Sequence, residues 1–486
     1  MDKKIIKNFI YNIGYQILTM LLPIITVPYV SRVLDADSIG IYSYTFSITQ
    51  IFLIIGMFAV GSYGVKEIAS NRDDLKYISK KFYEIRLMQK STMIVAIIIY
   101  ILIFIILGNS KYKTMYIIQS INLFAGLIDI SWLYIGIEDF KKIVTRNILV
   151  KMVSLVFIFI FVKNNNDIYA YTLILALSVF LGNLSMWVYK KNTVKNIKIK
   201  NYNLIKNLIL ASTLLVPQLC YEIYTSFDRS ILAWVSNMDS VGLFDQSQKI
   251  IRITVGIVTS LSIVMLPRIA NMINNNSKEE INKLLKKSID LTLFISMGCS
   301  FGIFAISDNF VPWFYGENYL NVAILLKISS IVCILTSLGS FFSNQYAIPS
   351  GNKKAYMIPI IIAAIISIIL NIILGYKLGA VGACIAIVLT EMFALILRML
   401  YLKSDFKYRY LFNNLIYFFI SATIMVFSIN CIRYLLNLKA NIISTLIEVF
   451  IGAITYIITL IILKREYLIL FKDIIFRIKN KNKRFN

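Results

Sequence analysis

The sequence predicts an all-α polytopic membrane protein with about 14 transmembrane helices, and three observations support this fold class. Apolar residues fill 58% of the 486 positions, whereas charged residues fill only 15%. Mean hydropathy is +0.74, which is more apolar surface than a soluble fold could bury. Apolar segments of about 20 residues, the length needed to span a bilayer, recur along the whole chain.

The helices follow from apolar segments that end at charges, glycines, prolines and asparagine clusters. A first group of six lies near 9–33, 39–65, 85–108, 114–136, 143–162 and 168–189. A second group of six lies near 207–235, 241–267, 288–309, 321–344, 355–376 and 380–402. Two further helices lie near 411–436 and 441–463. Because the number of helices is even, both termini are expected on the same side.

Positive charge alternates from loop to loop and predicts the orientation. With a cytoplasmic N-terminus, the cytoplasmic segments hold 39 of the 50 Lys and Arg residues and the outer segments hold 7. Since basic residues concentrate in cytoplasmic loops, both termini are expected in the cytoplasm. The basic segments 66–90 and 464–486 either contact anionic lipids of the inner leaflet or are solvated loops that only enforce topology.

Residue usage weighs against an enzyme, a metal site and a nucleic-acid-binding protein. The chain has no histidine, the commonest general base and metal ligand near neutral pH. The five cysteines stand singly in apolar segments, so neither a disulfide framework nor a zinc site is expected. The chain lacks a GxxxxGK[ST] motif, which weighs against an ATP-driven pump. Topology alone explains the excess of basic residues.

A short motif indicates an internal duplication. Asp-Ser-Ile-Gly at 37–40 begins the second helix, and Asp-Ser-Val-Gly at 239–242 begins the eighth, 202 residues later. Six helices separate the two copies, so the repeats share one orientation and would hold a transported substrate between them. We therefore predict an N-terminal six-helix lobe at 1–200, a C-terminal six-helix lobe at 201–403, and two additional helices with a basic tail at 404–486.

Cations inside helices are the candidate substrate-binding residues. A charge at bilayer depth costs upward of about 2.5 kcal/mol, so it usually faces a cavity or a partner. Arginine matches phosphate oxygens bidentately, which favours a phosphorylated or pyrophosphate-bearing lipid as the substrate class. Alternatively, neighbouring acids neutralise these cations in a network that holds the helices together. The candidate cations are Arg229, Lys249, Arg252, Arg32 and Lys327.

Acids and prolines inside the predicted helices also have two interpretations each. The acids either carry a coupling proton or sodium ion, or serve as pairing partners. They are Asp228, Asp245, Asp129, Glu222 and Glu391. Pro23, Pro28 and Pro217 interrupt helical hydrogen bonding, so the bends they cause are either gates or ordinary packing features. No resident cofactor is expected. H⁺ or Na⁺ is the expected coupling ion if one is used.

Segments along essentially the whole chain resemble one known family. They are 12–14, 21–34, 40–42, 228–229, 241–250, 266–270, 348–354 and 371–383. Together these segments resemble the Wzx-type polysaccharide repeat-unit flippases of the multidrug/oligosaccharidyl-lipid/polysaccharide exporter superfamily. The resemblance implies a V-shaped pair of lobes that alternates between inward-open and outward-open states.

The resemblance also implies a cargo. This would be an undecaprenyl-pyrophosphate-linked oligosaccharide, moved to the outer leaflet of the bacterial cell membrane for capsule, O-antigen or teichoic-acid assembly. Cavity cations would bind the phosphates, and polysaccharide-assembly proteins are candidate partners. Two alternatives stay open. A cation-coupled drug or small-molecule antiporter of the same superfamily would prefer an acidic cavity, and a membrane polysaccharide polymerase or ligase would need a larger outer loop than 307–320.

Overall fold

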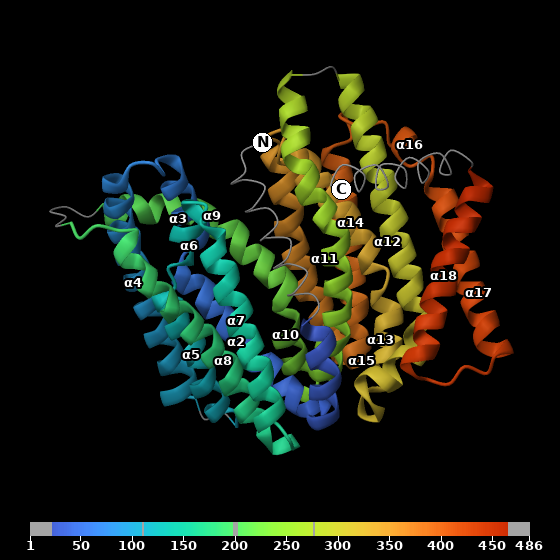
Figure 1. The fold of residues 1–486 in the computed structure, drawn as a ribbon, viewed down its shortest axis with the longest axis horizontal. Helices are drawn as coiled ribbons and strands as arrows, with labels where there is room; N and C mark the ends of the chain where they lie inside the picture. The colour runs from blue at the N-terminus through green and yellow to red at the C-terminus, as the bar shows by residue number, and fades with distance from the viewer. Residues whose placement is uncertain (1–21, 109–110, 198–202, 276–277, 465–486) are drawn as a thin grey trace, which may run out of the picture. The chain divides into compact units, whose positions relative to one another are not determined.

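The computed structural model describes residues 22–108, 111–197, 203–275 and 278–464, and all regular secondary structure in these ranges is helical (Figure 1). The predicted start of the first helix, 9–21, and the basic tail from 465 to 486 lie outside the described residues. The all-α prediction is confirmed, and every predicted span coincides with a helix or with consecutive helices.

The first six predicted spans correspond to residues 22–192. The first span is described as the helix Leu22–Val33. The others are α2 (Ala36–Met57) with α3 (Val60–Ser70), α4 (Leu75–Ile101) with η1 (Leu102–Ile106), α5 (Lys113–Ile128) with α6 (Ser131–Gly136), α7 (Phe140–Phe161), and η2 (Asn165–Asp167), α8 (Ile168–Ser185) and η3 (Met186–Asn192).

The remaining eight spans correspond to residues 204–463. They are α9 (Leu204–Ser226) with α10 (Asp228–Val235), α11 (Met238–Asn275), α12 (Lys278–Tyr315), η4 (Glu317–Tyr319) with α13 (Val322–Ser329), α14 (Val332–Ser340) and η5 (Phe341–Ala347), α15 (Lys353–Tyr401), α16 (Tyr408–Leu411) with α17 (Leu415–Leu435), and α18 (Ile442–Leu463).

Helix α15 contains two of the predicted spans. Its 49 residues would extend over more than twice the hydrocarbon thickness of about 30 Å if the helix were straight. Gly379 breaks it with φ 56° and ψ −131°, a conformation open mainly to glycine. The break falls between the predicted spans 355–376 and 380–402, at the glycine-containing sequence that separates them.

Ten helices among the described residues are long and apolar enough to cross a membrane. Counting α15 as two spans, and adding α5, the charged helix α11 and the first helix, accounts for all fourteen predicted spans. Large apolar side chains also point outward, as on α18, where Ile443 and Phe450 are each 67% exposed. Such a surface is stable only in lipid, so the chain is a multi-pass membrane protein.

Several spans that are continuous in the sequence are broken in the structure. Phe58 and Ala59 separate α2 from α3 with φ 46° and 56°, and Asp129 with Ile130 separates α5 from α6. Two π-helices, η1 and η5, widen the turns at the ends of α4 and α14. Discontinuous helices of this kind are typical of transporter substrate sites.

The chain forms two compact units. The first contains residues 1–245 and 364–380, and the second contains 246–363 and 381–486. Around Phe82 and Trp132 in the first unit, aromatic and aliphatic side chains pack into a buried cluster. A larger cluster in the second unit includes Phe341, Phe342 and Phe418. The compact units divide the chain at points other than 200 and 403, and the lobe boundaries given above stay a prediction.

The start of each repeat has the same local structure in the first unit. Asp35 Oδ1 accepts a hydrogen bond from Ser38 N at 2.8 Å. Its counterpart 202 residues later, Asn237, accepts one from Ser240 N at the same distance of 2.8 Å. Both side chains cap the first turn of a helix, α2 and α11 respectively.

The glycines of the repeated motif contact each other's helices reciprocally. A Cβ atom on Gly40 would overlap the Met238 carbonyl oxygen, and a Cβ atom on Gly242 would overlap the Ala36 carbonyl oxygen. The two contacts are related by the same offset of 202 residues that the sequence motif shows. This pseudo-twofold contact supports the duplication, and it requires glycine at both positions because two helix backbones meet there.

Candidate functional site

Asp228 and Arg229 begin the short helix α10, and packing buries both side chains. Asp228 is 3% exposed and Arg229 is 7% exposed. Arg229 Nε donates a hydrogen bond to Asp245 Oδ1 of α11 at 2.6 Å. Because both partners are buried, their charges offset each other inside the first unit.

Neighbouring polar groups attach α10 to two more helices of the first unit. Ser367 Oγ and Asn371 Nδ2 of α15 each donate to Asp228 Oδ1 at 2.9 Å. Ser230 Oγ lies 2.5 Å from Ser47 Oγ of α2. The cluster therefore matches the interpretation in which acids and cations pair and hold helices together, and Arg229 as a phosphate ligand stays a prediction.

Lys249 and Arg252 lie in the second unit, on one face of α11 because they are three residues apart. Lys249 Nζ donates to Gln246 Oε1 at 3.1 Å and is partly buried. Arg252 is exposed. Both residues have further contacts with the rest of the molecule. The exposure of Arg252 makes it accessible to an anionic group, and the binding role of both residues stays a prediction.

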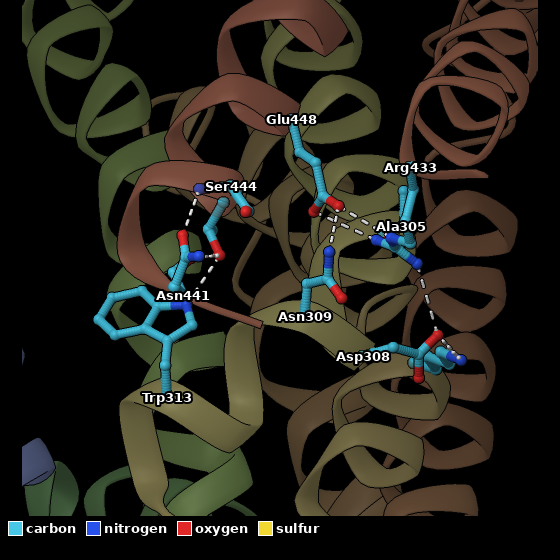
Figure 2. A network of polar contacts seen from close by, with 10 residues as sticks. Ala305, Asp308, Asn309, Trp313, Arg433, Asn441, Ser444 and Glu448 are labelled. Atoms are coloured by element: carbon cyan, nitrogen blue, oxygen red, sulfur yellow. Dashed lines mark hydrogen bonds and ion pairs between the residues drawn. The ribbon is translucent and has the colours of Figure 1, made fainter. Parts of the chain in front are cut away.

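Lys327 belongs to an ion-pair network that joins α13 to the last two helices of the second unit. Its Nζ donates to Asp308 Oδ2 of α12 at 2.7 Å. Figure 2 shows Arg433 between this carboxylate and Glu448. Arg433 Nε donates to Glu448 Oε1 at 2.8 Å, and Asn309 Nδ2 donates to the same oxygen at 2.6 Å.

The buried carboxylate of Glu448 explains why this network is structural. Its side chain is 0% exposed, so the charge needs a partner within the protein. Arg433 supplies that partner from α17 and also donates to the Ala305 carbonyl oxygen of α12 at 2.6 Å. Trp313 Nε1 adds a hydrogen bond to Thr445 Oγ1 at 2.7 Å. The network holds α17 and α18 against α12. Asp308 neutralises the charge of Lys327.

The remaining sequence candidates are dispersed. Arg32 is exposed at the end of the first helix, where its Nη1 donates to the Pro28 carbonyl oxygen at 2.9 Å. Asp129 Oδ1 accepts from Ser131 N, the first residue of α6, at 2.8 Å. Glu391 is 7% exposed in α15, and Glu222 is partly buried in α9. The described residues contain no cluster of three or more potential metal ligands.

Three prolines were predicted to bend helices. Pro23 and Pro28 lie in the helix Leu22–Val33, and Pro217 lies in α9. Their part in gating stays a prediction.

Four buried charged residues were not among the sequence candidates, and one of them, Lys286, pairs with Asp290 at 2.6 Å. Glu448 could have been found, because a carboxylate inside the predicted helix 441–463 meets the same criterion as Glu391. Glu84 is 1% exposed and lies 3.4 Å from Lys81 Nζ. Arg398 is 7% exposed at the end of α15. Glu84 and Arg398 stand next to predicted cytoplasmic loops, where a charge is ordinarily solvated, and no sequence signal distinguished them.

Two grooves in the structure are lined almost entirely by apolar groups. One lies between α7 and α8 in the first unit. The other lies between α11, α12, α17 and α18 in the second unit, where Gly302 leaves open space and Gly298 and Gly452 let side chains of neighbouring helices approach closely. Their chemistry suits hydrocarbon chains, so an anionic headgroup needs a site elsewhere.

The fold defines a class of protein, the polytopic helical membrane proteins. A solved structure described as the lipid II flippase MurJ in an inward closed conformation aligns with this chain at a TM-score of 0.72 and 18% identity. The alignment covers 95% of this chain and 100% of that one. At this identity the likeness shows a shared fold.

The family follows from the sequence comparison. Residues 5–273 match the family described as polysaccharide biosynthesis protein, and the chain belongs to that family. It is 23% identical over 405 residues to a putative O-antigen transporter of Escherichia coli K12, covering 82% of this chain and 97% of that protein. It is also 23% identical over 411 residues to the capsular polysaccharide biosynthesis protein CapF of Staphylococcus aureus, covering 82% and 100%.

Proposed function

We propose that this protein is a flippase that moves a lipid-linked oligosaccharide from the cytoplasmic to the outer leaflet by alternating access. The observation that carries the proposal is the fold shared with a lipid II flippase over 95% of the chain, in a member of a polysaccharide biosynthesis family. The chain is a transporter, and its polar groups bind and release cargo without a chemical step.

The phosphates of such a cargo need cations that a headgroup can reach. Arg252 is exposed, and Lys249 lies one turn away on the same face of α11. An arginine and a lysine at this spacing can bind neighbouring oxygens of a pyrophosphate group. Arg229 is a weaker candidate because Asp245 already neutralises it at 2.6 Å. Arg252 and Lys249 are therefore the first residues to test.

Transport is tested with the purified full chain in proteoliposomes. The probe is undecaprenyl-pyrophosphate-linked N-acetylglucosamine, and the readout is the rate at which its sugar becomes accessible to an impermeant lectin. The wild-type chain should accelerate this exposure, and Arg252→Gln or Lys249→Gln should slow it at least about 10-fold, the loss of one charge-assisted contact. Lys377→Gln, which removes an exposed cation from another region, is the matched control.

Two outcomes of this transport assay would contradict parts of the proposal. If the wild-type chain exposes no sugar but exports a cationic dye such as ethidium, the protein is a drug antiporter on the same fold. If the sugar is exposed at unchanged rates in both variants, the flippase stands and the binding role of α11 is wrong.

A proton or sodium gradient is the proposed energy source, with the buried Glu391 as the candidate coupling carboxylate. Imposing either gradient across the proteoliposome should change the initial rate of the wild-type chain, and Glu391→Gln should abolish that response. A rate that neither gradient alters would contradict secondary transport.

The proposed location is the bacterial cytoplasmic membrane, with both termini in the cytoplasm and polysaccharide-assembly proteins as partners. A reporter that is active only in the cytoplasm should be active when it is fused after Asn486. Activity restricted to the outer side would overturn the orientation.

A further inference from the structure

Arg398 has a setting that differs from those of Arg229 and Arg433. It lies in the last turn of α15 in the second unit and is 7% exposed. Its Nε is buried without a hydrogen-bond partner. Across the described ranges its guanidinium makes no hydrogen bond and no ion pair, whereas Arg229 is bound by Asp245 and Arg433 by Glu448.

The guanidinium lies against a gap in the neighbouring helix. A Cβ atom on Gly339 of α14 would lie 2.7 Å from Arg398 Nη1, and no atom outside the Arg398 side chain would lie within 4 Å of it. Any larger residue at 339 would displace the guanidinium. Glycine at this position therefore makes room for a cation that meets no acid among the described residues.

Two unsatisfied hydroxyl groups follow the same helix face. Thr336 precedes Gly339 by three residues and Ser343 follows it by four, spacings that place all three on one side of α14 and η5. The Thr336 Oγ1 and Ser343 Oγ atoms are buried and have no hydrogen-bond partner within the described parts of the chain. Arg398, Thr336 and Ser343 thus offer several hydrogen-bond donors and, among the described residues, no paired negative charge. They lie next to η5, and π-helical turns are frequent at functional sites.

Topology and helix electrostatics do not explain this arrangement. A cation at a helix C-terminus interacts favourably with the helix dipole, but that interaction is small compared with the cost of burying an unpaired guanidinium. Lys403 and Lys407, which follow directly, supply positive charge to the same predicted cytoplasmic loop from exposed positions. Burial of Arg398 therefore needs a ligand that the described part of the chain does not provide.

We propose that Arg398, with the hydroxyls of Thr336 and Ser343, forms an anion site that binds the phosphate or pyrophosphate group of the lipid-linked cargo. The proposal rests on the proposed function, and it adds a site in the second unit apart from the cations of α11. The guanidinium binds two phosphate oxygens side by side, and the hydroxyls donate to a third. The predicted topology places this end of α15 on the cytoplasmic side, so the site takes cargo at the start of the transport cycle.

Binding is measured with the full chain in lipid nanodiscs, using undecaprenyl pyrophosphate and, separately, inorganic pyrophosphate as probes. Arg398→Met should weaken binding of the lipid about 10- to 100-fold, the loss of a charge-assisted pair, and Arg398→Lys should weaken it less. Gly339→Val should have the effect of Arg398→Met, although the arginine is still present. Lys403→Gln, an equal loss of charge at an exposed position, should leave binding unchanged.

Stability without ligand separates a binding role from a structural one. An unpaired buried charge destabilises the empty protein, so the thermal midpoint of ligand-free Arg398→Met should equal or exceed that of the wild type. The wild type should gain thermal stability when undecaprenyl pyrophosphate is added, and the variant should not. A ligand-free midpoint several degrees below the wild type would overturn the proposal, because Arg398 would then hold the helices together.

The two probes and the transport assay distinguish the remaining outcomes. Lipid binding that Arg398→Met leaves unchanged overturns the site. Inorganic pyrophosphate that binds at Arg398 and is not displaced by the lipid also overturns it, since the site would then serve a soluble anion. If Arg398-dependent lipid binding is found but the wild type flips nothing, the site stands and the proposed function fails.

Discussion

The two repeats share their backbone features at the start of α2 and α11 but differ in charge. Both begin with a capping side chain, Asp35 or Asn237, and both place a glycine where two helices meet. At the same offset of 202 residues, the positions of Asp245, Lys249 and Arg252 are held by Ser43, Ser47 and Gln50 in the first repeat. The repeats thus retain what the helix contact needs, and at these three positions only the second carries ionised groups.

The helix before each motif shows the same contrast. Asp228 and Arg229 correspond to Thr26 and Val27. The charges of the second repeat therefore arose or persisted on one side of a symmetric contact, and symmetry of the fold does not require them. Charged groups that a fold does not need are the ones to connect with cargo or coupling.

The largest effect is expected from separating Arg229 from Asp245. Asp245→Asn should destabilise the protein by about 3–5 kcal/mol, because it leaves a buried guanidinium without a counter-charge. Ser43→Ala, at the equivalent position of the first repeat, should leave stability unchanged or raise it slightly, because Ser43 Oγ is buried without a hydrogen-bond partner in the described parts of the chain. Thermal unfolding of the purified variants measures both.

The double variant Arg229→Met with Asp245→Leu sharpens this comparison. Removing both charges should restore most of the stability. If cargo flipping returns as well, the pair is purely structural; if stability returns without flipping, Arg229 has a role in transport. A double variant as unstable as Asp245→Asn would contradict the pairing.

Intermediate effects are expected at the glycines where the repeats meet. Gly40→Ala and Gly242→Ala should each lower stability by about 1–3 kcal/mol, since the added methyl group overlaps a helix carbonyl. The two losses should be similar because the contacts are reciprocal. Unequal losses, with one variant as stable as the wild type, would break the pseudo-twofold relation.

Gly302→Ala is the matched control for these glycines. Gly302 lies within α12, and a Cβ atom there would meet nothing within 4 Å. Alanine favours a helix over glycine by up to about 1 kcal/mol, so this variant should be neutral or stabilising. The control removes the helix propensity of alanine as an explanation for any loss at Gly40 and Gly242.

Most of the fold could be predicted from the sequence because the hydropathy of a short segment determines whether it spans the membrane. Each predicted span matches described helices, and the break at Gly379 falls between two predicted spans. Breaks within a continuous apolar run, such as that at Phe58 and Ala59, could not be predicted. They depend on packing against helices distant in sequence, and neither residue is a glycine or proline that would mark them.

The candidate site was less predictable because charge pairing is a three-dimensional property. The sequence showed that Arg229 and Asp245 both lie inside helices and raised their neutralisation as one interpretation. It did not show that Asn371 binds Asp228 across 143 residues. It also gave no sign that Arg398 is buried, since this follows from the glycine at 339 on another helix.

The smallest effect is expected at the two capping residues. The loss of stability should be larger in the first repeat than in the second. Asn237→Ala removes one hydrogen bond to Ser240 N and should cost about 0.5–1 kcal/mol. Asp35→Ala should cost more, up to about 2 kcal/mol, because Asp35 also accepts a hydrogen bond from Asn165 Nδ2 at 2.6 Å. Asn165→Ala should cost more than that excess and leave the cap intact, because it also removes the hydrogen bond that Asp35 N donates to Asn165 Oδ1 at 3.0 Å. Equal thermal midpoints for Asp35→Ala and Asn237→Ala would mean that the contact with Asn165 adds nothing, and that the two helix starts are energetically as well as geometrically equivalent.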